Sequence, residues 1–499
     1  MAHGERGAPA EQPVLLYQSS GKIYPRDVHG RYARLRVAAM LALLGLFYGL
    51  PWLRFGGTPL VLFDLPARRF HVFGLTIVPQ DFYLLAALLL AAALTLFFFT
   101  TLAGRLWCGY ACPQTVWTEA FLWIERLFEG DRHIRMKLDR GPWDANKLLR
   151  KGGKHLAWAA FALFTGFSFV AYFVPTTTLI DEIAHGALSG WSLFWVLFYA
   201  FATWGNAGFM REQVCKYMCP YARFQSAMFD RDTLIIAYDE KRGEPRKSVF
   251  RKLLQQRAPS AAAVLAGERA EHEFDAATLK QGDCIDCSLC VQACPVGIDI
   301  RKGLQYECIA CAACIDACNE VMDQVHRPRG LIRYSSARHD AGGRFHIVRG
   351  RALGYGAVWL AVLIATATLI VTRSPFDLDV VRDRKQLYRE LADGSIENVY
   401  AVKLSNKQER ERRYAIRAEF IDGTPASVEP DRFSAGPGQH VSMTVAARAH
   451  GAHPSVARLR FTVTADDGPG TRRSRTATFL SDGREHDADA DEPHEHPGD

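Results

Sequence analysis

The sequence predicts a multidomain membrane protein in which an α-helical transmembrane bundle with five spans is joined to a cysteine-rich domain and a C-terminal β-sandwich. Three observations predict this fold class. Five apolar segments each approach the roughly 20 residues that a helix needs to cross a bilayer. Eight of the 12 cysteines repeat one spacing, and the C-terminal part alternates as strands do. The apolar segments cover residues 37–53, 82–102, 156–174, 191–210 and 352–371.

Basic residues predict how the spans are oriented. Lys and Arg crowd the N-terminal arm (residues 1–36), the loop after the second span and the run before the fifth, whereas residues 175–190 contain neither. By the positive-inside rule, the N-terminus and the even-numbered loops are cytoplasmic, and the segment after the fifth span is outside. The net charge of +7 is modest. Orientation accounts for these residues better than nucleic-acid binding does, so we expect no nucleic acid as a partner.

Eight cysteines in residues 279–330 form two quartets, each with the spacing C-x2-C-x2-C-x3-C. This is the bacterial ferredoxin pattern, in which three thiolates of one quartet hold a [4Fe-4S] cluster and the fourth closes the neighbouring cluster. The sequence therefore predicts a cytoplasmic ferredoxin domain with two [4Fe-4S] clusters. We expect a first cluster set of Cys284, Cys287, Cys290 and Cys318, and a second cluster set of Cys308, Cys311, Cys314 and Cys294.

Disulfides and zinc account for these eight cysteines less well than clusters do. A disulfide framework requires an oxidising compartment, whereas the predicted topology places the segment in the cytoplasm. Zinc sites use paired C-x2-C motifs, and two complete quartets suit zinc poorly. Pro295 follows the first quartet as in ferredoxins, but Asn319 stands where the second proline is expected. Because proline only fixes the backbone there, this departure concerns the loop and not the ligands.

The four remaining cysteines, the four-thiol site, lie in two matching motifs within the membrane domain of residues 37–246. Both motifs read C-x-Tyr-x-C-P, in "WCGYACPQ" and "VCKYMCPY". Each follows a pair of spans and precedes an amphipathic stretch, "QTVWTEAFLWIERLF" or "YARFQSAMFDRDTLIIAY", which predicts an internal repeat of two spans, motif and surface helix. Two copies packed about a pseudo-twofold axis would gather the thiols beside the clusters. They are Cys108, Cys112, Cys215 and Cys219.

The motif predicts soft-metal or electron-transfer chemistry. If the backbone is helical across it, cysteines at i and i+4 share a face, and a following proline suits the first turn of a new helix. Thiolates favour Cu(I), zinc or iron–sulfur clusters. The alternative, that these cysteines are small buried hydrophobic residues, does not account for two identical spacings with tyrosine and proline. A bound quinone remains possible because tryptophans surround the motifs, although interfacial tryptophan is common.

The rest of the chain divides by composition. Residues 60–80 alternate like a short hairpin between the first two spans. We expect a helical connector over residues 247–278, a basic juxtamembrane linker over 331–351 and the fifth span over 352–372. Short alternating segments over 373–481 predict an immunoglobulin-like β-sandwich without a disulfide. Residues 482–499 form an acidic tail that we expect to be disordered. Its histidines could capture a metal, and they are His486, His494 and His496.

Together these segments resemble the cytochrome c oxidase accessory proteins of the CcoG/FixG type. The strings that carry the resemblance are "GKIYPRDVHGRYARLR", "VLFDLPARRFHVFGLTIVPQDF", "RLWCGYACPQTVWTE" and "CKYMCPYARFQSAMFD", with the double ferredoxin motif and the outer β-domain. The resemblance implies a bacterial inner-membrane protein whose β-domain is periplasmic. It also implies a role in assembling a cbb-type oxidase by reducing Cu(II) to Cu(I), with the four-thiol site at or near the copper or electron exit.

Three hypotheses of function follow. The first is a cupric reductase, with copper as substrate or bound ion. It implies as partners copper chaperones or transporters, the oxidase assembly machinery and a cytoplasmic electron donor, with a possible homo-oligomer. The second is a membrane ferredoxin that exchanges electrons with quinone, as in membrane subunits with similar C-x3-C-P hairpins. The third is a non-enzymatic, copper-binding assembly scaffold whose clusters sense redox state.

Overall fold

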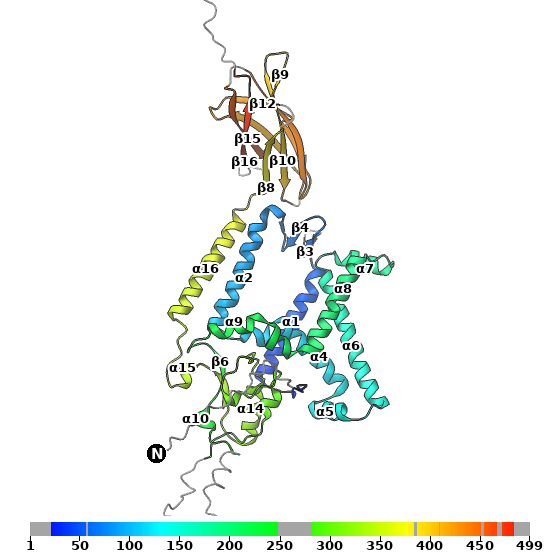
Figure 1. Ribbon diagram of the computed structural model, residues 1–499, viewed down its shortest axis with the longest axis vertical. Helices are drawn as coiled ribbons and strands as arrows, with labels where there is room; N and C mark the ends of the chain where they lie inside the picture. The colour runs from blue at the N-terminus through cyan, green and yellow to red at the C-terminus, as the bar shows by residue number, and fades with distance from the viewer. Residues whose placement is uncertain are drawn as a thin grey trace, which may run out of the picture. The chain divides into compact units, whose positions relative to one another are not determined.

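The chain forms two compact units, Met1–Leu53 with Leu90–Ala361 and Arg54–Leu89 with Val362–Asp499 (Figure 1). The structure is a computed structural model. Apart from residues 247, 482 and 483, the expected connector and the acidic tail with its three histidines lie outside the described residues. The described residues are 21–55, 58–247, 281–383, 387–408, 410–450, 454–466 and 472–483.

Four helices in the described part of the chain are long and apolar enough to cross a membrane, and they coincide with four of the five predicted spans. They are Arg31–Trp52, Phe82–Ala103, Gly190–Met210 and Gly350–Val371. The remaining segment, residues 156–174, lies mostly in helix α6 (Ala145–Val170). Basic side chains interrupt the first turns of α6, which leaves a shorter apolar run. The prediction of exactly five spans is therefore not confirmed.

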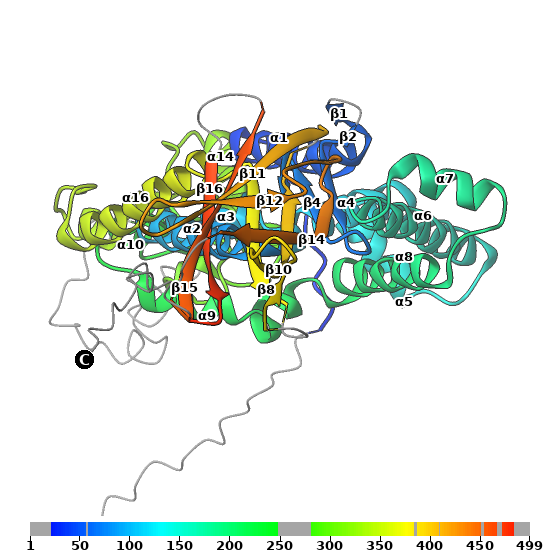
Figure 2. The ribbon, with the colours of Figure 1, turned by 90° about the horizontal axis from the view of Figure 1, so that it is seen from above.

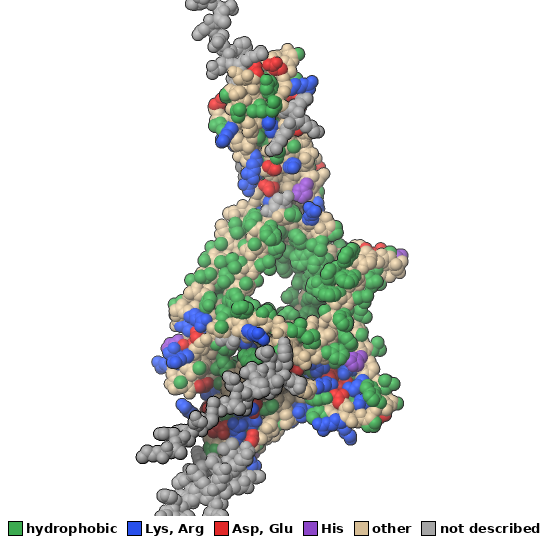
Figure 3. All heavy atoms as spheres, viewed as in Figure 1, with side chains coloured by type: hydrophobic (Ala, Val, Ile, Leu, Met, Phe, Trp, Pro, Cys, Tyr) green, Lys and Arg blue, Asp and Glu red, His purple; other side chains and the backbone are tan. Residues whose placement is uncertain are grey.

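In the first unit, helices α4 (Pro113–Glu129), α6 and α8 (Gly190–Thr203) are grouped together (Figure 2). Gly166 permits the close approach of α6 to α8, because a Cβ there would lie 2.2 Å from the carbonyl oxygen of Val196. The buried Trp158 on α6 donates a hydrogen bond to the carbonyl of Phe121 on α4, at 3.0 Å. Figure 3 shows hydrophobic side chains over α1 (Arg31–Gly49) and α8, as expected for surfaces that face lipid.

Helices α2 (Phe82–Ala103) and α16 (Gly350–Val371) run side by side (Figure 1). Within the first unit, the rings of Phe98 and Trp359 stack with centroids 5.1 Å apart. The Trp359 indole also donates a hydrogen bond to Thr95 Oγ1, at 2.8 Å. These contacts fix how the two helices pair along this part of their length.

The cysteine-rich part of the first unit contains two short helices and a two-stranded sheet. The helices are α13 (Leu289–Ala293) and α14 (Ala313–Gln324), and strand β6 (Ile235–Tyr238) pairs antiparallel with β7 (Ile332–Ser335). This pairing corrects two expectations. The second amphipathic stretch is helical only over α9 (Pro220–Met228) and then becomes β6. The linker expected from residue 331 begins with β7, because Ile332 of β7 packs with Ile236 and Tyr238 of β6 in the domain core.

The second unit contains a pair of two-residue strands, β1 (Arg54–Phe55) and β2 (Thr58–Pro59), then three short antiparallel strands and a β-sandwich. The short strands are β3 (Val61–Asp64), β4 (Arg69–Val72) and β5 (Leu75–Ile77), one more than the predicted hairpin requires. The sandwich strands are β8 (Phe376–Arg382), β9 (Arg389–Glu390), β10 (Ile396–Asn406), β11 (Arg412–Phe420), β12 (Pro425–Glu429), β13 (Arg432–Ala435), β14 (His440–Ala449), β15 (Val456–Ala465) and β16 (Arg472–Leu480).

Two antiparallel layers enclose the sandwich core. One layer contains β8, β9, β10 and β14, the other contains β11, β13, β15 and β16, and β12 pairs with both β11 and β14. Ring contacts cross between the layers, with Tyr400 against Phe461 at 4.7 Å and Phe376 against Tyr414 at 5.2 Å between centroids. All four rings are buried. The alternation read from the sequence therefore places one face of each layer in a common core.

Candidate iron–sulfur and thiol site

Two hollows in the cysteine-rich domain are lined by the two predicted cluster sets. One hollow is lined by Cys284, Cys287, Cys290 and Cys318. The other is lined by Cys294, Cys308, Cys311 and Cys314, and Cys290 also reaches it. The fourth cysteine of each quartet thus crosses to the hollow of the other quartet, as the ferredoxin spacing predicts.

The cysteine loops share an unusual backbone conformation. Asp286 and Ser288 in the first quartet have φ angles of 57° and 59°, and Ala310 and Ala312 occupy the same positions of the second quartet with 54° and 60°. Non-glycine residues adopt this left-handed region rarely, and alternating left-handed turns direct successive backbone N–H groups into one concavity. The repeated conformation fits loops that wrap an anionic cluster.

The donor atoms also fit [4Fe-4S] clusters. Burial raises the pKa of Cys290 to about 11 and that of Cys308 to about 12, so these are enclosed thiols that ionise only with a positive partner. In the described part of the chain, no three His, Cys, Asp or Glu side chains converge as ligands of one metal ion. Thiols that line a hollow without converging on a point suit a cluster better than one tetrahedral zinc.

The departure at Asn319 has a structural cause. Pro295 follows α13 where the helix has ended, whereas Asn319 lies inside α14. Proline within α14 would remove a helical hydrogen bond. The Asn319 side chain instead accepts a hydrogen bond from the backbone N–H of Gly330, at 3.0 Å. The asparagine therefore fastens the loop before β7 to the cluster domain.

The two C-x3-C-P motifs have related but different backbones. The first motif begins in helix α3 (Leu106–Tyr110), and the second lies in a π-helical turn, Val214–Met218. Neither helix includes the second cysteine, since Cys112 and Cys219 are extended, so the premise of one continuous helix is wrong. Proline at the first position of α4 and of α9 is as expected, because its missing N–H has no role there.

The four thiols influence one another electrostatically. Burial, and then the charge of Cys112, raises the pKa of Cys108 to about 11. Burial raises the pKa of Cys215 to about 12, with further contributions from Cys112, Cys108 and Cys219. The Cys108 thiol donates a hydrogen bond to the buried Gln225 amide oxygen, at 3.3 Å. The thiols of the two motifs are thus close enough to raise one another's pKa, although no three of these four described residues converge on one point. Binding of a soft metal ion would displace their protons.

The first motif packs directly against the second cluster set. A Cβ on Gly109 would lie 2.8 Å from both Cys311 Cα and the carbonyl oxygen of Ile309, so only glycine fits between Cys108 and Tyr110. Cys108 also packs on the buried apolar cluster that contains Ile309 and Cys311. No sequence pattern marked Gly109, because the two segments are about 200 residues apart in the chain.

The N-terminal arm and the start of α1 are hydrogen-bonded to the cluster domain. Arg36 donates a hydrogen bond to the carbonyl of Cys311, at 2.7 Å. The buried Asp316 of α14 accepts hydrogen bonds from the N–H groups of Tyr32 and Ala33, at 3.3 and 2.7 Å. Gly30, which precedes α1, supplies no side-chain cap, so Asp316 caps this helix from the cluster domain.

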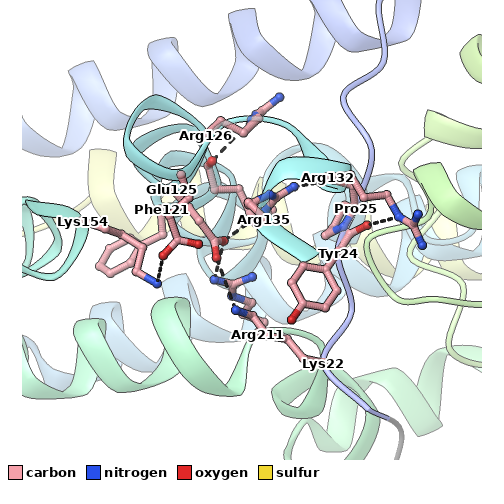
Figure 4. Close-up of polar contacts among 12 residues, drawn as sticks. Lys22, Tyr24, Pro25, Phe121, Glu125, Arg126, Arg132, Arg135, Lys154 and Arg211 are labelled. Carbon is pink, nitrogen blue, oxygen red and sulfur yellow. Dashed lines mark hydrogen bonds and ion pairs between the residues drawn. The ribbon is translucent and has the colours of Figure 1, made fainter. Parts of the chain in front are cut away.

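A buried ion network joins the two copies of the repeat (Figure 4). Glu125 on α4 is fully buried and pairs with Arg211, 2.7 Å away in the segment before Cys215, and with Arg135 at 3.3 Å. Burial alone would raise the pKa of Glu125, but these two arginines lower it. Arg135 also donates to the carbonyl of Pro25, at 2.7 Å. The sequence suggested only that such basic residues set membrane orientation.

Three stretches of the chain match described families. Residues 85–132 match a 4Fe-4S binding domain, residues 210–337 a 4Fe-4S dicluster domain, and residues 366–482 the IG-like fold at the C-terminal of FixG. The first match contains Cys108 and Cys112, and the second contains Cys215, Cys219 and both cluster sets.

Relatives match most of the chain. Protein RdxB of Cereibacter sphaeroides is 40% identical over 442 residues, which cover 84% of this chain and 88% of RdxB. Protein RdxA of the same organism is 37% identical over 472 residues, 91% of this chain and 92% of RdxA. The nitrogen fixation protein FixG of Rhizobium meliloti is 37% identical over 449 residues, 83% of this chain and 81% of FixG. The chain belongs to the FixG/CcoG family. This FixG-family protein is a membrane iron–sulfur protein with a C-terminal immunoglobulin-like domain.

Proposed function

We propose that the protein is a cupric reductase in which electrons pass from cytoplasmic [4Fe-4S] clusters to copper held by the four-thiol site. The observation that carries this proposal is the packing of Gly109 and Cys108 on the loop of Cys311, which brings the first motif into direct contact with the second cluster set. A cavity lined by Cys215 and Cys311 lies beside the second motif. Both motifs therefore adjoin the same cluster loop.

The two groups of cysteines have different roles in the proposed reaction. The clusters, when bound by the two cysteine sets, would supply one-electron transfer. The Cys108 thiol lies on the cluster side of the four-thiol site, and thiolates favour Cu(I) over Cu(II), which stabilises the product. Each electron converts one Cu(II) to one Cu(I), and each bound thiol releases its proton to solvent.

The proposed topology has five spans, with α6 as the third, so that the N-terminus and the cluster domain are cytoplasmic and the β-sandwich is periplasmic. The basic loops support this orientation. We further propose that the Cu(I) product serves the assembly of a cbb-type oxidase, through copper chaperones or transporters. The family resemblance supports that role.

The test begins with protein purified without oxygen and analysed for iron, sulfide and copper. The clusters are reduced with dithionite, excess reductant is removed, and Cu(II) is added while EPR follows the clusters and a Cu(I)-specific chelator follows the product. We expect one Cu(I) for each cluster electron lost. A variant with all four thiols changed to alanine should keep its clusters and react at least tenfold more slowly.

Several outcomes would reject this proposal. Reduced clusters that do not react with Cu(II), or a four-thiol variant that reacts at the wild-type rate, would each exclude it. Cluster reduction by a quinol without any copper requirement would favour a membrane ferredoxin. Copper binding that survives replacement of the cluster cysteines, without any reduction by the intact protein, would favour an assembly scaffold.

A further inference from the structure

Arg105, which directly precedes α3, is a buried cation without an acidic partner. It is 4% exposed, and among the described residues its guanidinium donates hydrogen bonds only to backbone carbonyls, those of Tyr306, Cys308 and Ala222. Its Nε has no hydrogen-bond partner within the described ranges. In the part of the chain that the structure describes, no Asp or Glu lies within ion-pair distance of it. A buried charge in this situation is unfavourable unless a ligand supplies the opposite charge.

The carbonyls that Arg105 contacts belong to the two sites described above. Cys308 is a member of the second cluster set, and its carbonyl oxygen is 3.3 Å from Arg105 Nη1. Ala222 lies in α9, three residues after Cys219, and Arg105 itself precedes Cys108 by three residues. The guanidinium therefore connects both C-x3-C-P motifs with the loop of the second cluster set.

Several sulfur atoms near Arg105 can become negative. Burial lowers the pKa of Arg105, and the charges of Cys108, Cys308, Cys215 and Cys219 act in the opposite direction. A cluster held by four thiolates is an anion, and so is a copper ion bound by two or more thiolates. Both candidate sites would thus supply negative charge to the same cation when they are filled.

We propose that Arg105 is a positioning residue whose guanidinium is the shared counter-charge of the second cluster and of the copper-loaded four-thiol site. For copper, this inference rests on the proposed function. A nearby positive charge stabilises the more negative, reduced form of a cluster, so Arg105 raises the reduction potential of the second cluster. By the same attraction, it strengthens the binding of Cu(I) as a thiolate complex.

The first experiment measures cluster potentials in the full-length protein by EPR-monitored redox titration without copper. In Arg105→Gln, we expect one of the two clusters to be harder to reduce by about tenfold in the equilibrium constant, which is 59 mV for one electron. Arg105→Lys keeps the charge and should remain within threefold of the wild type. A potential unchanged in Arg105→Gln would overturn the proposal.

A matched control separates charge from structure. Arg349 is also largely buried and donates to a backbone carbonyl, that of Thr101, but it pairs with Asp230 at 2.8 Å. Arg349→Gln should therefore leave both potentials unchanged. If Arg105→Gln does not retain its iron, Arg105→Lys decides the question. Retention of the wild-type potential in that variant supports the charge, and a tenfold shift would show that the hydrogen bonds matter instead.

The second experiment measures Cu(I) affinity by anaerobic competition with a chelator. We expect Arg105→Gln to bind Cu(I) about tenfold more weakly than the wild type, and Arg349→Gln to bind it equally well. Equal affinity in Arg105→Gln would exclude the copper part of the inference. If the wild type itself does not bind Cu(I), the proposed function fails, whereas the titration without copper still tests Arg105 on the cluster.

Discussion

The two C-x3-C-P motifs read alike in the sequence and differ in their surroundings. In both, the second cysteine is extended, with φ and ψ of −62° and 129° at Cys112 and −80° and 107° at Cys219, and a proline begins the next helix. Tyr110 lies 3.3 Å from the hydroxyl of Tyr334, whose own hydroxyl donates to the carbonyl of Ala310 in the cluster loop. Its counterpart Tyr217 is 38% exposed. The tyrosine of the first copy is therefore linked by hydrogen bonds to the cluster loop, whereas the tyrosine of the second copy is partly exposed.

The residue after the first cysteine accounts for much of this difference. It is Gly109 in the first copy and Lys216 in the second. Glycine lets the backbone of the first copy touch the Cys311 loop, and a lysine side chain could not occupy that space. The two copies carry cysteines at matching positions, but the residue after the first cysteine gives them different contacts with the cluster domain.

The largest expected effect comes from breaking the ion pair that joins the copies. Glu125→Ala removes the carboxylate shared by Arg135 and Arg211, which leaves two buried cations uncompensated. We expect a loss of about 3–5 kcal/mol in the free energy of unfolding. Unfolding of the purified full-length protein in detergent, followed by the loss of cluster absorbance, measures it.

Glu119→Ala is the matched control for this change. Glu119 is also on α4, but its side chain is 26% exposed and pairs with Arg126 at 3.2 Å. Removing a pair that solvent screens should lower the free energy of unfolding by less than about 1 kcal/mol. Equal losses in the two variants would show that the buried network does not hold the copies together.

A smaller loss of stability is expected when the residue after the first cysteine of the first motif is changed to alanine. In Gly109→Ala the new methyl group would meet the Cys311 backbone, so we expect a loss of about 1–3 kcal/mol in the free energy of unfolding and slower oxidation of the clusters by Cu(II). Lys216→Ala, the equivalent change in the second copy, should alter stability by less than about 0.5 kcal/mol. A Gly109→Ala protein as stable as the wild type would mean that the close contact is not needed.

The sequence predicted the chemistry of the site better than its assembly. Cysteine spacing predicted both cluster sets and the two motifs because three ligands of each predicted cluster lie close together in the chain. Gly109, Asp316 and Arg105 act through contacts with residues far away in the sequence, and an isolated glycine, aspartate or arginine carries no periodic signal. The strand pair of β6 and β7 was missed for the same reason, because its partners are about 100 residues apart.

The smallest expected difference concerns the first thiol of each motif. The pKa of Cys108 is raised to about 11 and that of Cys215 to about 12, in both cases mainly by burial. Only the thiolate is alkylated, so at pH 8 about one Cys108 in 10³ and one Cys215 in 10⁴ should be reactive. Cys108 should therefore react faster than Cys215.

Mass spectrometry of copper-free protein treated with iodoacetamide would measure both rates. Each rate should rise about tenfold for every unit of pH between 7 and 10, since the neutral thiol predominates throughout this range. If Cu(I) binds thiols of both copies, it should protect Cys108 and Cys215 together. Protection of Cys215 alone would instead place the metal in the second copy and leave the first copy to electron transfer.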